Sequence, residues 1–328
     1  MTTFLVTLTP MLTLFICMAI GFIFTKLKIL PDGASQVMAK MEIWIFCPAL
    51  GFITMARFCT VETIGEHFIN MVLSTIGILF AVFIAIFLSR AFGKKNSPER
   101  RVYAYSLAFA NSGYVGEPFV LAMFGEMVFS YYKLFCLPFS FLVYSWGVCV
   151  LMPPTEKKNS VWKQLLNPPT ISILVGMAVG LSGLGRFLPE FLTDSLDSLK
   201  ACMGPVAMLL AGAIIAKYDA FSMLKKGKVY VATAFRLVVL PAVMVAFTFC
   251  LKTLANIAFG LSIGNDVLFI VLIATATPVG LNSVVFPEAY GGNSKTGAGL
   301  VMISHTLCVI TIPLLYTLMV AIFGAPFQ

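Results

Sequence analysis

Two short motifs combine polar side chains with helix-breaking residues inside otherwise apolar stretches. The first is Asn111-Ser-Gly-Tyr-Val-Gly-Glu-Pro118 and the second is Thr275-Ala-Thr-Pro-Val-Gly-Leu-Asn-Ser283. Proline removes a backbone donor and clashes with the preceding turn, and glycine lowers the cost of unwinding a helix. In hydrocarbon, the freed backbone groups persist only where protein or a watery cavity satisfies them. We therefore expect both motifs to interrupt membrane helices at a polar site.

A helix that restarts after such a break directs its free N–H groups and positive dipole end into the gap, where a carboxylate is a natural guest. Breaks at matching positions of two halves indicate a substrate site. The candidate substrate ligands in the two motifs are Asn111, Ser112, Gly116, Pro118, Thr277, Pro278, Gly280, Asn282 and Ser283. The alternative is that proline and glycine only kink these helices, as they often do in membrane spans.

A few ionisable side chains lie in or near apolar stretches, where charge is expensive and marks a functional hypothesis. Glu117 is a candidate for binding a coupling proton or cation, or for hydrogen-bonding substrate; otherwise it is an acid at a half-helix exit that reaches water. Arg236 needs an acid or helix-terminal carbonyls, as a structural anchor or as a substrate clamp. His305 is either a hydrogen-bonded core histidine or a proton relay. Glu42 and Lys40 are expected at the membrane interface, where both can reach water, with a role in transport as the alternative.

The composition requires a membrane around these residues. The 328-residue chain is 59% hydrophobic and only 11% charged, whereas an ordinary soluble domain has about 25% charged residues. A spanning helix needs about 20 apolar residues. Apolar runs of suitable length occur at residues 4–25, 34–56, 67–90, 101–124, 129–152, 169–185, 192–216, 229–251, 267–288 and 297–323. The sequence thus predicts an all-α polytopic protein with ten transmembrane helices, of which the fourth and ninth are broken.

The basic residues predict its orientation. Most of the 22 lysines and arginines fall in alternate connections, at Lys26, Lys28, Arg90, Lys94, Lys95, Arg100, Arg101, Lys157, Lys158, Lys163, Lys217, Lys225, Lys226, Lys228 and Lys295. The other connections receive only Arg57, Lys133, Arg186, Lys200 and Lys252. Positive residues favour the cytoplasmic side, so we expect a cytoplasmic-membrane protein with both termini outside. The net charge of +8 then reflects the lipid bilayer rather than a nucleic-acid partner.

An internal repeat supports the count of ten. Pro10-Met-Leu-Thr-Leu-Phe-Ile-Cys-Met-Ala-Ile-Gly21 matches Pro169-Thr-Ile-Ser-Ile-Leu-Val-Gly-Met-Ala-Val-Gly180 at the proline, Met-Ala and glycine positions. Each half contains five predicted spans, an odd number, so the halves enter the membrane from opposite sides. Such a five-plus-five inverted repeat is typical of secondary transporters.

The combined motifs resemble the auxin efflux carrier family, and in particular its bacterial members. The likeness covers essentially the whole chain and rests on Asn167-Pro168-Pro169, the break from Asn111 to Pro118 followed by Phe124-Gly125, Arg236 followed by Pro241-Ala-Val-Met244, and Thr277-Pro278-Val-Gly280 followed by Tyr290-Gly291.

The resemblance implies a fold similar to that of bile-acid sodium symporters, with the fourth and ninth helices crossing at the substrate site. Residues 1–60 and 169–217 would form scaffold helices and a homodimer interface. Residues 61–152 and 218–328 would form a transport domain that moves like an elevator, and 153–168 a short cytoplasmic linker. Two features depart from the family: the connection at 153–166 is short, which argues against control by phosphorylation of a long loop, and Glu117 stands where an aliphatic residue is more usual.

The sequence therefore predicts a secondary transporter of a small organic anion, such as malate, malonate or an auxin-like acid. A ligand-sensing receptor-like protein or a channel on the same fold is the alternative. The sequence shows no nucleophile placed with a base, so we expect neither an enzyme nor a cofactor. Coupling to sodium and coupling to protons both remain open interpretations of Glu117.

Overall fold

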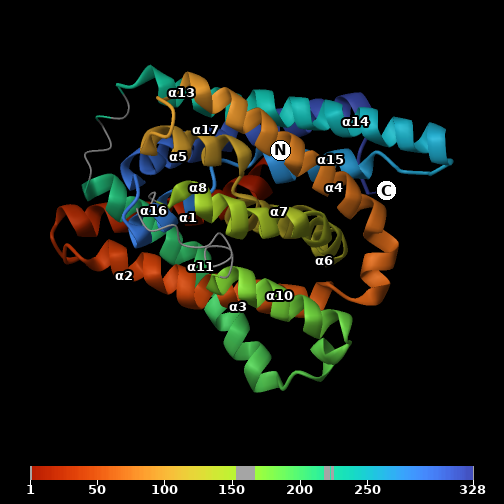
Figure 1. The fold of residues 1–328 in the computed structure, drawn as a ribbon, viewed down its shortest axis with the longest axis horizontal. Helices are drawn as coiled ribbons and strands as arrows, with labels where there is room; N and C mark the ends of the chain where they lie inside the picture. The colour runs from red at the N-terminus through yellow and green to blue at the C-terminus, as the bar shows by residue number, and fades with distance from the viewer. Residues whose placement is uncertain (1, 153–166, 218–221, 223–224, 328) are drawn as a thin grey trace.

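The structure is a computed structural model that describes residues 2–152, 167–217, 222 and 225–327. Within these ranges every regular element is helical (Figure 1), and the β-type pairing is a single antiparallel bridge between Ala110 and Val279. The predicted all-helical class is thus confirmed for the described residues. The predicted linker 153–168 falls mainly in 153–166, outside the described residues.

The described residues of the first half form eight α-helices: α1 (Thr2–Lys26), α2 (Ala34–Met41), α3 (Cys47–Phe58), α4 (Val61–Leu88), α5 (Pro98–Ala108), α6 (Glu117–Phe135), α7 (Leu137–Leu142) and α8 (Val148–Leu151). Shorter π- or 3₁₀-helical turns adjoin them: η1 (Glu42–Phe46), η2 (Ser89–Ala91), η3 (Ser112–Gly116) and η4 (Val143–Gly147). Inside α6, Gly125 has φ of 76°, a left-handed value that glycine tolerates, and the helix kinks there.

The described helices of the second half are α10 (Pro168–Leu181), α11 (Glu190–Lys217), α13 (Gly227–Ala234), α14 (Leu240–Phe259), α15 (Asp266–Ala276), α16 (Asn282–Tyr290) and α17 (Ser294–Phe323). Two short turns accompany them, η5 (Leu184–Phe187) and η6 (Phe235–Val239).

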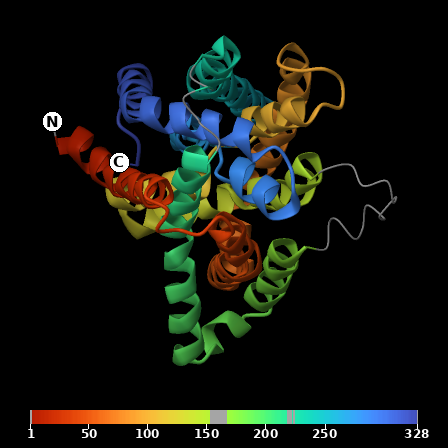
Figure 2. The same ribbon diagram turned by 90° about the vertical axis from the view of Figure 1, so that its left-hand side faces the viewer.

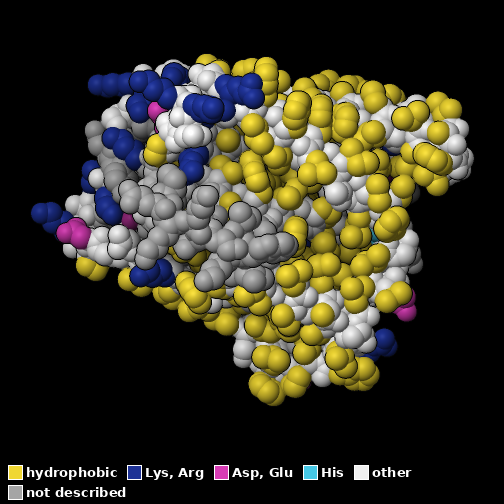
Figure 3. Space-filling view, in the orientation of Figure 1, with side chains coloured by type: hydrophobic (Ala, Val, Ile, Leu, Met, Phe, Trp, Pro, Cys, Tyr) yellow, Lys and Arg dark blue, Asp and Glu magenta, His cyan; other side chains and the backbone are white. Residues whose placement is uncertain are grey.

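Several described helices have the length and composition needed to cross a membrane. Five qualify on their own: Ala34–Phe58, His67–Ala91, Glu190–Lys217, Gly227–Phe259 and Ser294–Phe323. A sixth span results if Met127–Phe135 and Leu137–Leu151, bent by 42°, count as one. Figure 3 shows apolar side chains over much of the visible surface, whereas lysine and arginine gather at the end where α5 and α13 begin. The chain is therefore a membrane protein.

Glycines allow two pairs of helices to approach closely, as small residues do in membrane bundles. A Cβ on Gly21 of α1 would lie 2.1 Å from the Leu209 carbonyl oxygen of α11, and one on Gly176 of α10 would lie 2.6 Å from that of Phe52 on α3. In Figure 2, α2 and α3 lie between α10 and α11. The helices α1, α3, α10 and α11 thus form one packed group.

Both predicted breaks are present. Helix α5 ends at Ala108 and helical structure resumes at Ser112, while α15 ends at Ala276 and α16 begins at Asn282. Pro118 lies in the first turn of α6, after its break rather than at it.

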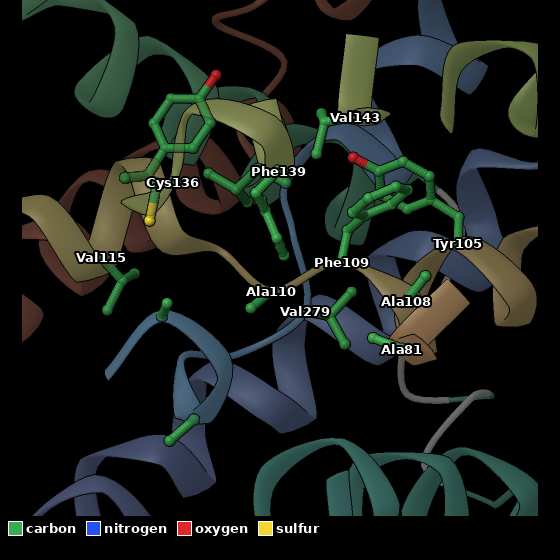
Figure 4. Packing of buried hydrophobic residues seen from close by; sticks show 14 of the residues in the cluster. Ala81, Tyr105, Ala108, Phe109, Ala110, Val115, Cys136, Phe139, Val143 and Val279 are labelled. Carbon is green, nitrogen blue, oxygen red and sulfur yellow. The ribbon is translucent and has the colours of Figure 1, made fainter. Parts of the chain in front are cut away.

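The two interrupted segments satisfy each other's backbone groups, which is what hydrocarbon demands. The Asn111 N–H donates to the Pro278 carbonyl at 2.8 Å, and the Gly280 N–H donates to the Phe109 carbonyl at 3.3 Å. The segments lie side by side at Ala110 and Val279 (Figure 4), deep in the molecule.

Candidate functional site

A cavity lies against the paired breaks. Its walls include residues 110–114 from the first break and 280–282 from the second, together with Gly51 of α3 and Met203 of α11. The volume open to a water-sized molecule is about 70 Å³; the larger figure of about 730 Å³ for all space between atoms includes open solvent. Because helices restart at Ser112 and Asn282, two helix N-termini border the same cavity, which suits it to an anion.

The cavity continues into a wider vestibule. Both spaces share Tyr114, Glu117 and Met203, and the vestibule also touches Arg57 and Asp197. Arg57 and Asp197 form an ion pair of 2.6 Å between α3 and α11 near the surface. The vestibule thus offers a path from solvent to the breaks.

The cavity brings together only some of the predicted ligands. Asn111, Ser112, Gly280 and Asn282 line it, as does Glu117. Tyr105 and Tyr144 line the same cavity as Asn282, whose Oδ1 has no hydrogen-bond partner among the described residues.

Four other predicted ligands, Gly116, Thr277, Pro278 and Ser283, do not line the cavity. Gly116 packs against Tyr132, and a Cβ there would lie 2.1 Å from the Tyr132 hydroxyl. Pro278 forms the paired backbone described above, and Thr277 and Ser283 are buried. The hydroxyls of Thr277 and Ser283 have no hydrogen-bond partner among the described residues.

Asn111 is held by contacts on both sides of its amide. Its Oδ1 accepts from the Tyr114 N–H at 3.3 Å and its Nδ2 lies 3.1 Å from His305 Nε2. His305 Nδ1 lies 2.9 Å from the Val301 carbonyl, which can only accept, so Nδ1 carries the proton and Nε2 accepts from Asn111. This geometry favours the core-histidine interpretation of His305.

Arg236 is buried, and its guanidinium joins the two half-helices that precede the breaks. One nitrogen donates to the Leu107 carbonyl of α5 at 3.2 Å and the other to the Thr275 carbonyl of α15 at 2.6 Å. Carbonyls in the last turn of a helix lack intrahelical donors and carry the negative end of the dipole. Arg236 does not line the cavity, so its contacts favour the structural anchor.

A buried ion pair joins Glu117 and Lys133 in the cavity wall. The side chains are 18% and 5% exposed, respectively. The count of basic residues assigned Lys133 to a connection, which is wrong: it lies within α6, with its Nζ 5.3 Å from the centre of the Phe129 ring. The sequence did contain a sign that Lys133 lies within a helix, because Lys133 falls inside the predicted apolar run 129–152.

Glu42 is also misplaced by the sequence interpretation. It is fully buried in η1 rather than at the interface, while Lys40 is exposed as expected. The Tyr114 hydroxyl donates to Glu42 Oε2 at 3.3 Å, and Oε1 has no hydrogen-bond partner among the described residues. The π-helical turn Glu42–Phe46 changes which side chains face inward, and residue spacing gives no sign of such a turn.

A third carboxylate, Glu288 of α16, was not singled out at all. It accepts from Ser35 of α2 at 2.6 Å and from Ser294 of α17 at 2.9 Å, and it pairs with Lys217 of α11 at 3.1 Å. Asp197 lies in the first third of α11 and Lys217 is its last residue, roughly 30 Å further along at 1.5 Å per residue. The Glu288 cluster therefore closes the end of the molecule opposite the vestibule.

The helical bundle, its paired breaks and the cavity between them define a membrane transport protein. The profile of the membrane transport protein family matches residues 6–161 and 157–316, which together span most of the chain. The protein therefore belongs to this family, which confirms the resemblance to auxin efflux carriers. It is also 24% identical over 309 residues to an uncharacterised transporter of Methanocaldococcus jannaschii, a match that covers 92% of this chain and 96% of that relative.

Proposed function

We propose that the protein is a secondary transporter that moves a small organic anion, with a carboxylate as its binding group, across the cytoplasmic membrane. The observation that carries this proposal is the cavity at which two interrupted helices restart. Free N–H groups at helix N-termini bind anions without a metal or cofactor. Malate, malonate and auxin-like acids are the candidate substrates.

We further propose ten spans arranged as a five-plus-five inverted repeat, with the fourth and ninth spans crossing at the breaks. The helix pairing supports this arrangement. Helix α1 packs on α11 and α10 packs on α3, so the first span of each half pairs with the second span of the other. Arg236 likewise contacts equivalent carbonyls of the two broken helices.

Alternating access would proceed by an elevator movement of residues 61–152 and 218–328 against a scaffold of 1–60 and 169–217, which would also form a homodimer. The distribution of basic residues favours an orientation with both termini, and hence the vestibule, outside. In that orientation this conformation is open to the exterior, and the Glu288 cluster closes the cytoplasmic side. Inward opening then requires Glu288 to leave Ser35 and Lys217.

A thermal-shift screen of the purified protein tests the substrate class, because a ligand that binds the folded state raises its apparent stability. The panel contains malate, malonate and indole-3-acetate, with choline as a cationic control, with and without sodium at two pH values. We expect stabilisation by at least one carboxylate and none by choline. The stabilisation should be lost in Asn282→Ala, which changes the cavity wall, and kept in Thr253→Ala, whose hydroxyl bonds only within exposed α14. Stabilisation by choline alone contradicts the proposal.

A further inference from the structure

Charge inside the cavity is confined to one acid and one base. Among the described residues that line the cavity, the charged side chains are Glu117 and Lys133. They form an ion pair with each other, and Lys133 is almost completely shielded from solvent. Removing one partner from such a pair leaves an uncompensated buried charge, which is strongly destabilising. Lys133 therefore needs an anionic partner whether or not substrate is present.

The two members of the pair differ in their access to solvent. Glu117 lines both the cavity and the vestibule, whereas Lys133 lines only the cavity. Asn111 and Asn282, the predicted ligands at the breaks, belong to the same wall as Lys133. A carboxylate that enters through the vestibule thus meets Glu117 first, and it can reach Lys133 only if Glu117 gives up the ammonium group.

We propose that Lys133 is the cationic ligand of the transported carboxylate, and that Glu117 is an internal carboxylate that occupies Lys133 when the site is empty. The proposal rests on the carboxylate function proposed above and adds the specificity-determining residue. Substrate and Glu117 compete for one ammonium group. The ion pair with Glu117 neutralises Lys133 in the empty protein, and the substrate carboxylate replaces Glu117 in that pair.

The exchange requires a proton if charge in the cavity is to stay balanced. A substrate carboxylate adds one negative charge to the cavity. Glu117 offsets this charge by taking up one proton from the solvent in the vestibule, and it returns the proton to the solvent when the substrate leaves. Protonated Glu117 no longer pairs with Lys133. Among the described residues, the titratable or charged groups around the pair are Tyr132 of α6 and Cys136 immediately after it. The cavity adds Tyr105, Tyr144 and Tyr114, which donates to Glu42, and the vestibule adds Arg57, Asp197 and Lys200.

Those other groups have partners of their own. Arg57 and Lys200 both lie within ion-pair distance of Asp197, and Glu42 accepts from Tyr114. Glu117 is the acid whose ionisation directly decides whether Lys133 is available. Binding of carboxylate is therefore expected to tighten as pH falls, because a protonated Glu117 leaves Lys133 to the substrate.

Isothermal titration of the purified full chain with malonate and with indole-3-acetate, at several pH values, tests the exchange. Glu117→Gln imitates the protonated acid and should bind at least one probe about ten-fold more tightly at neutral pH, equivalent to about 1.4 kcal/mol, with little pH dependence. Lys133→Gln should weaken binding by about ten-fold or more. Glu99→Gln is the matched control, since Glu99 pairs with Lys226 on the exposed surface, and it should bind like the parent.

The double variant Glu117→Gln/Lys133→Gln is the control for misfolding of the single variants. It removes both charges and leaves two amides that can hydrogen-bond to each other. A folded double variant that binds malonate or indole-3-acetate as the parent does overturns the proposal, and so does equal binding by Lys133→Gln. If neither the parent nor Glu117→Gln binds any carboxylate, the proposed carboxylate function fails, and the role of Lys133 fails with it.

Discussion

Leu107 and Thr275 lie in the last turns of two different half-helices, yet their carbonyl oxygens accept hydrogen bonds from one guanidinium, that of Arg236. The two donors lie on a rigid planar fork, so the contact sets the spacing of α5 and α15 just before both chains become irregular. Beyond that point the two segments depend on each other for backbone hydrogen bonds. Arg236 thus positions the breaks without touching the cavity.

Replacing the guanidinium of Arg236 tests whether this side chain positions the two helix breaks. Arg236→Lys keeps the charge but loses the two-pronged geometry, and we expect a loss of about 1.5–3 kcal/mol in stability for one missing charged hydrogen bond. Thermal unfolding of the purified protein measures it, and carboxylate binding should weaken in parallel. Arg186→Lys is the control, since the hydrogen bond of Arg186 to the Gly183 carbonyl and its contact with the Phe187 ring are local and exposed. Equal stability of Arg236→Lys and the parent would contradict the anchor.

The contact between Ser35 and Glu288 tests the elevator movement. A short thiol-reactive cross-linker in Ser35→Cys/Glu288→Cys should tie α2 to α16, stop transport and leave carboxylate binding intact. The control pair Arg57→Cys/Asp197→Cys lies entirely in the proposed scaffold and replaces an existing contact. Cross-linking it should leave transport near the level of the parent treated with the same reagent. Undiminished transport in the first cross-linked pair excludes a movement that separates these helices.

Two variants of His305 test whether this side chain is a hydrogen-bonded core residue or a proton relay. His305→Leu leaves the Asn111 Nδ2 without an acceptor, which should cost about 1–3 kcal/mol of stability. His305→Gln supplies a carbonyl oxygen and should recover much of that loss. We expect the pH profile of carboxylate binding to be unchanged in His305→Gln. A pH dependence that disappears in this variant would instead show that His305 carries the proton.

Gly116 tests the packing behind the cavity. A methyl group there meets the Tyr132 hydroxyl, which donates to the Ser112 carbonyl. Gly116→Ala should lower stability by about 1–3 kcal/mol through overpacking, and Tyr132→Phe should restore part of it. Gly113→Ala is the matched control, because its new Cβ would lie 3.9 Å from Glu117 Oε1, an ordinary contact. Similar melting temperatures for the two alanine variants would contradict this packing.

The breaks could be predicted because their causes are local. Proline, glycine and asparagine act within a few residues, so Asn111 and Pro278 mark the interruptions in the sequence itself. The partners could not be predicted because they come from distant positions. Ser35 and Glu288 are separated by 253 residues, and hydrophobic periodicity says which face is buried without saying what it meets.

Lys133 illustrates a second reason why the contacts of the site could not be predicted from the sequence. Its pairing with Glu117 depends on the kink at Gly125, where φ is 76°. Without knowledge of that turn, a lysine near the start of an apolar run is assigned to the preceding loop. The positive-inside rule describes connections well, but it gives no information about a lysine neutralised inside the protein.

Counterflow in proteoliposomes tests the central claim most directly, because only a carrier exchanges substrate across a membrane against a preloaded pool. Liposomes loaded with unlabelled malonate or indole-3-acetate would receive trace labelled substrate outside. We predict transient, saturable accumulation of at least one label with the parent protein, and its loss in Asn282→Ala but not in Thr253→Ala. Binding without accumulation would instead indicate a receptor, and flux without saturation or counterflow would indicate a channel.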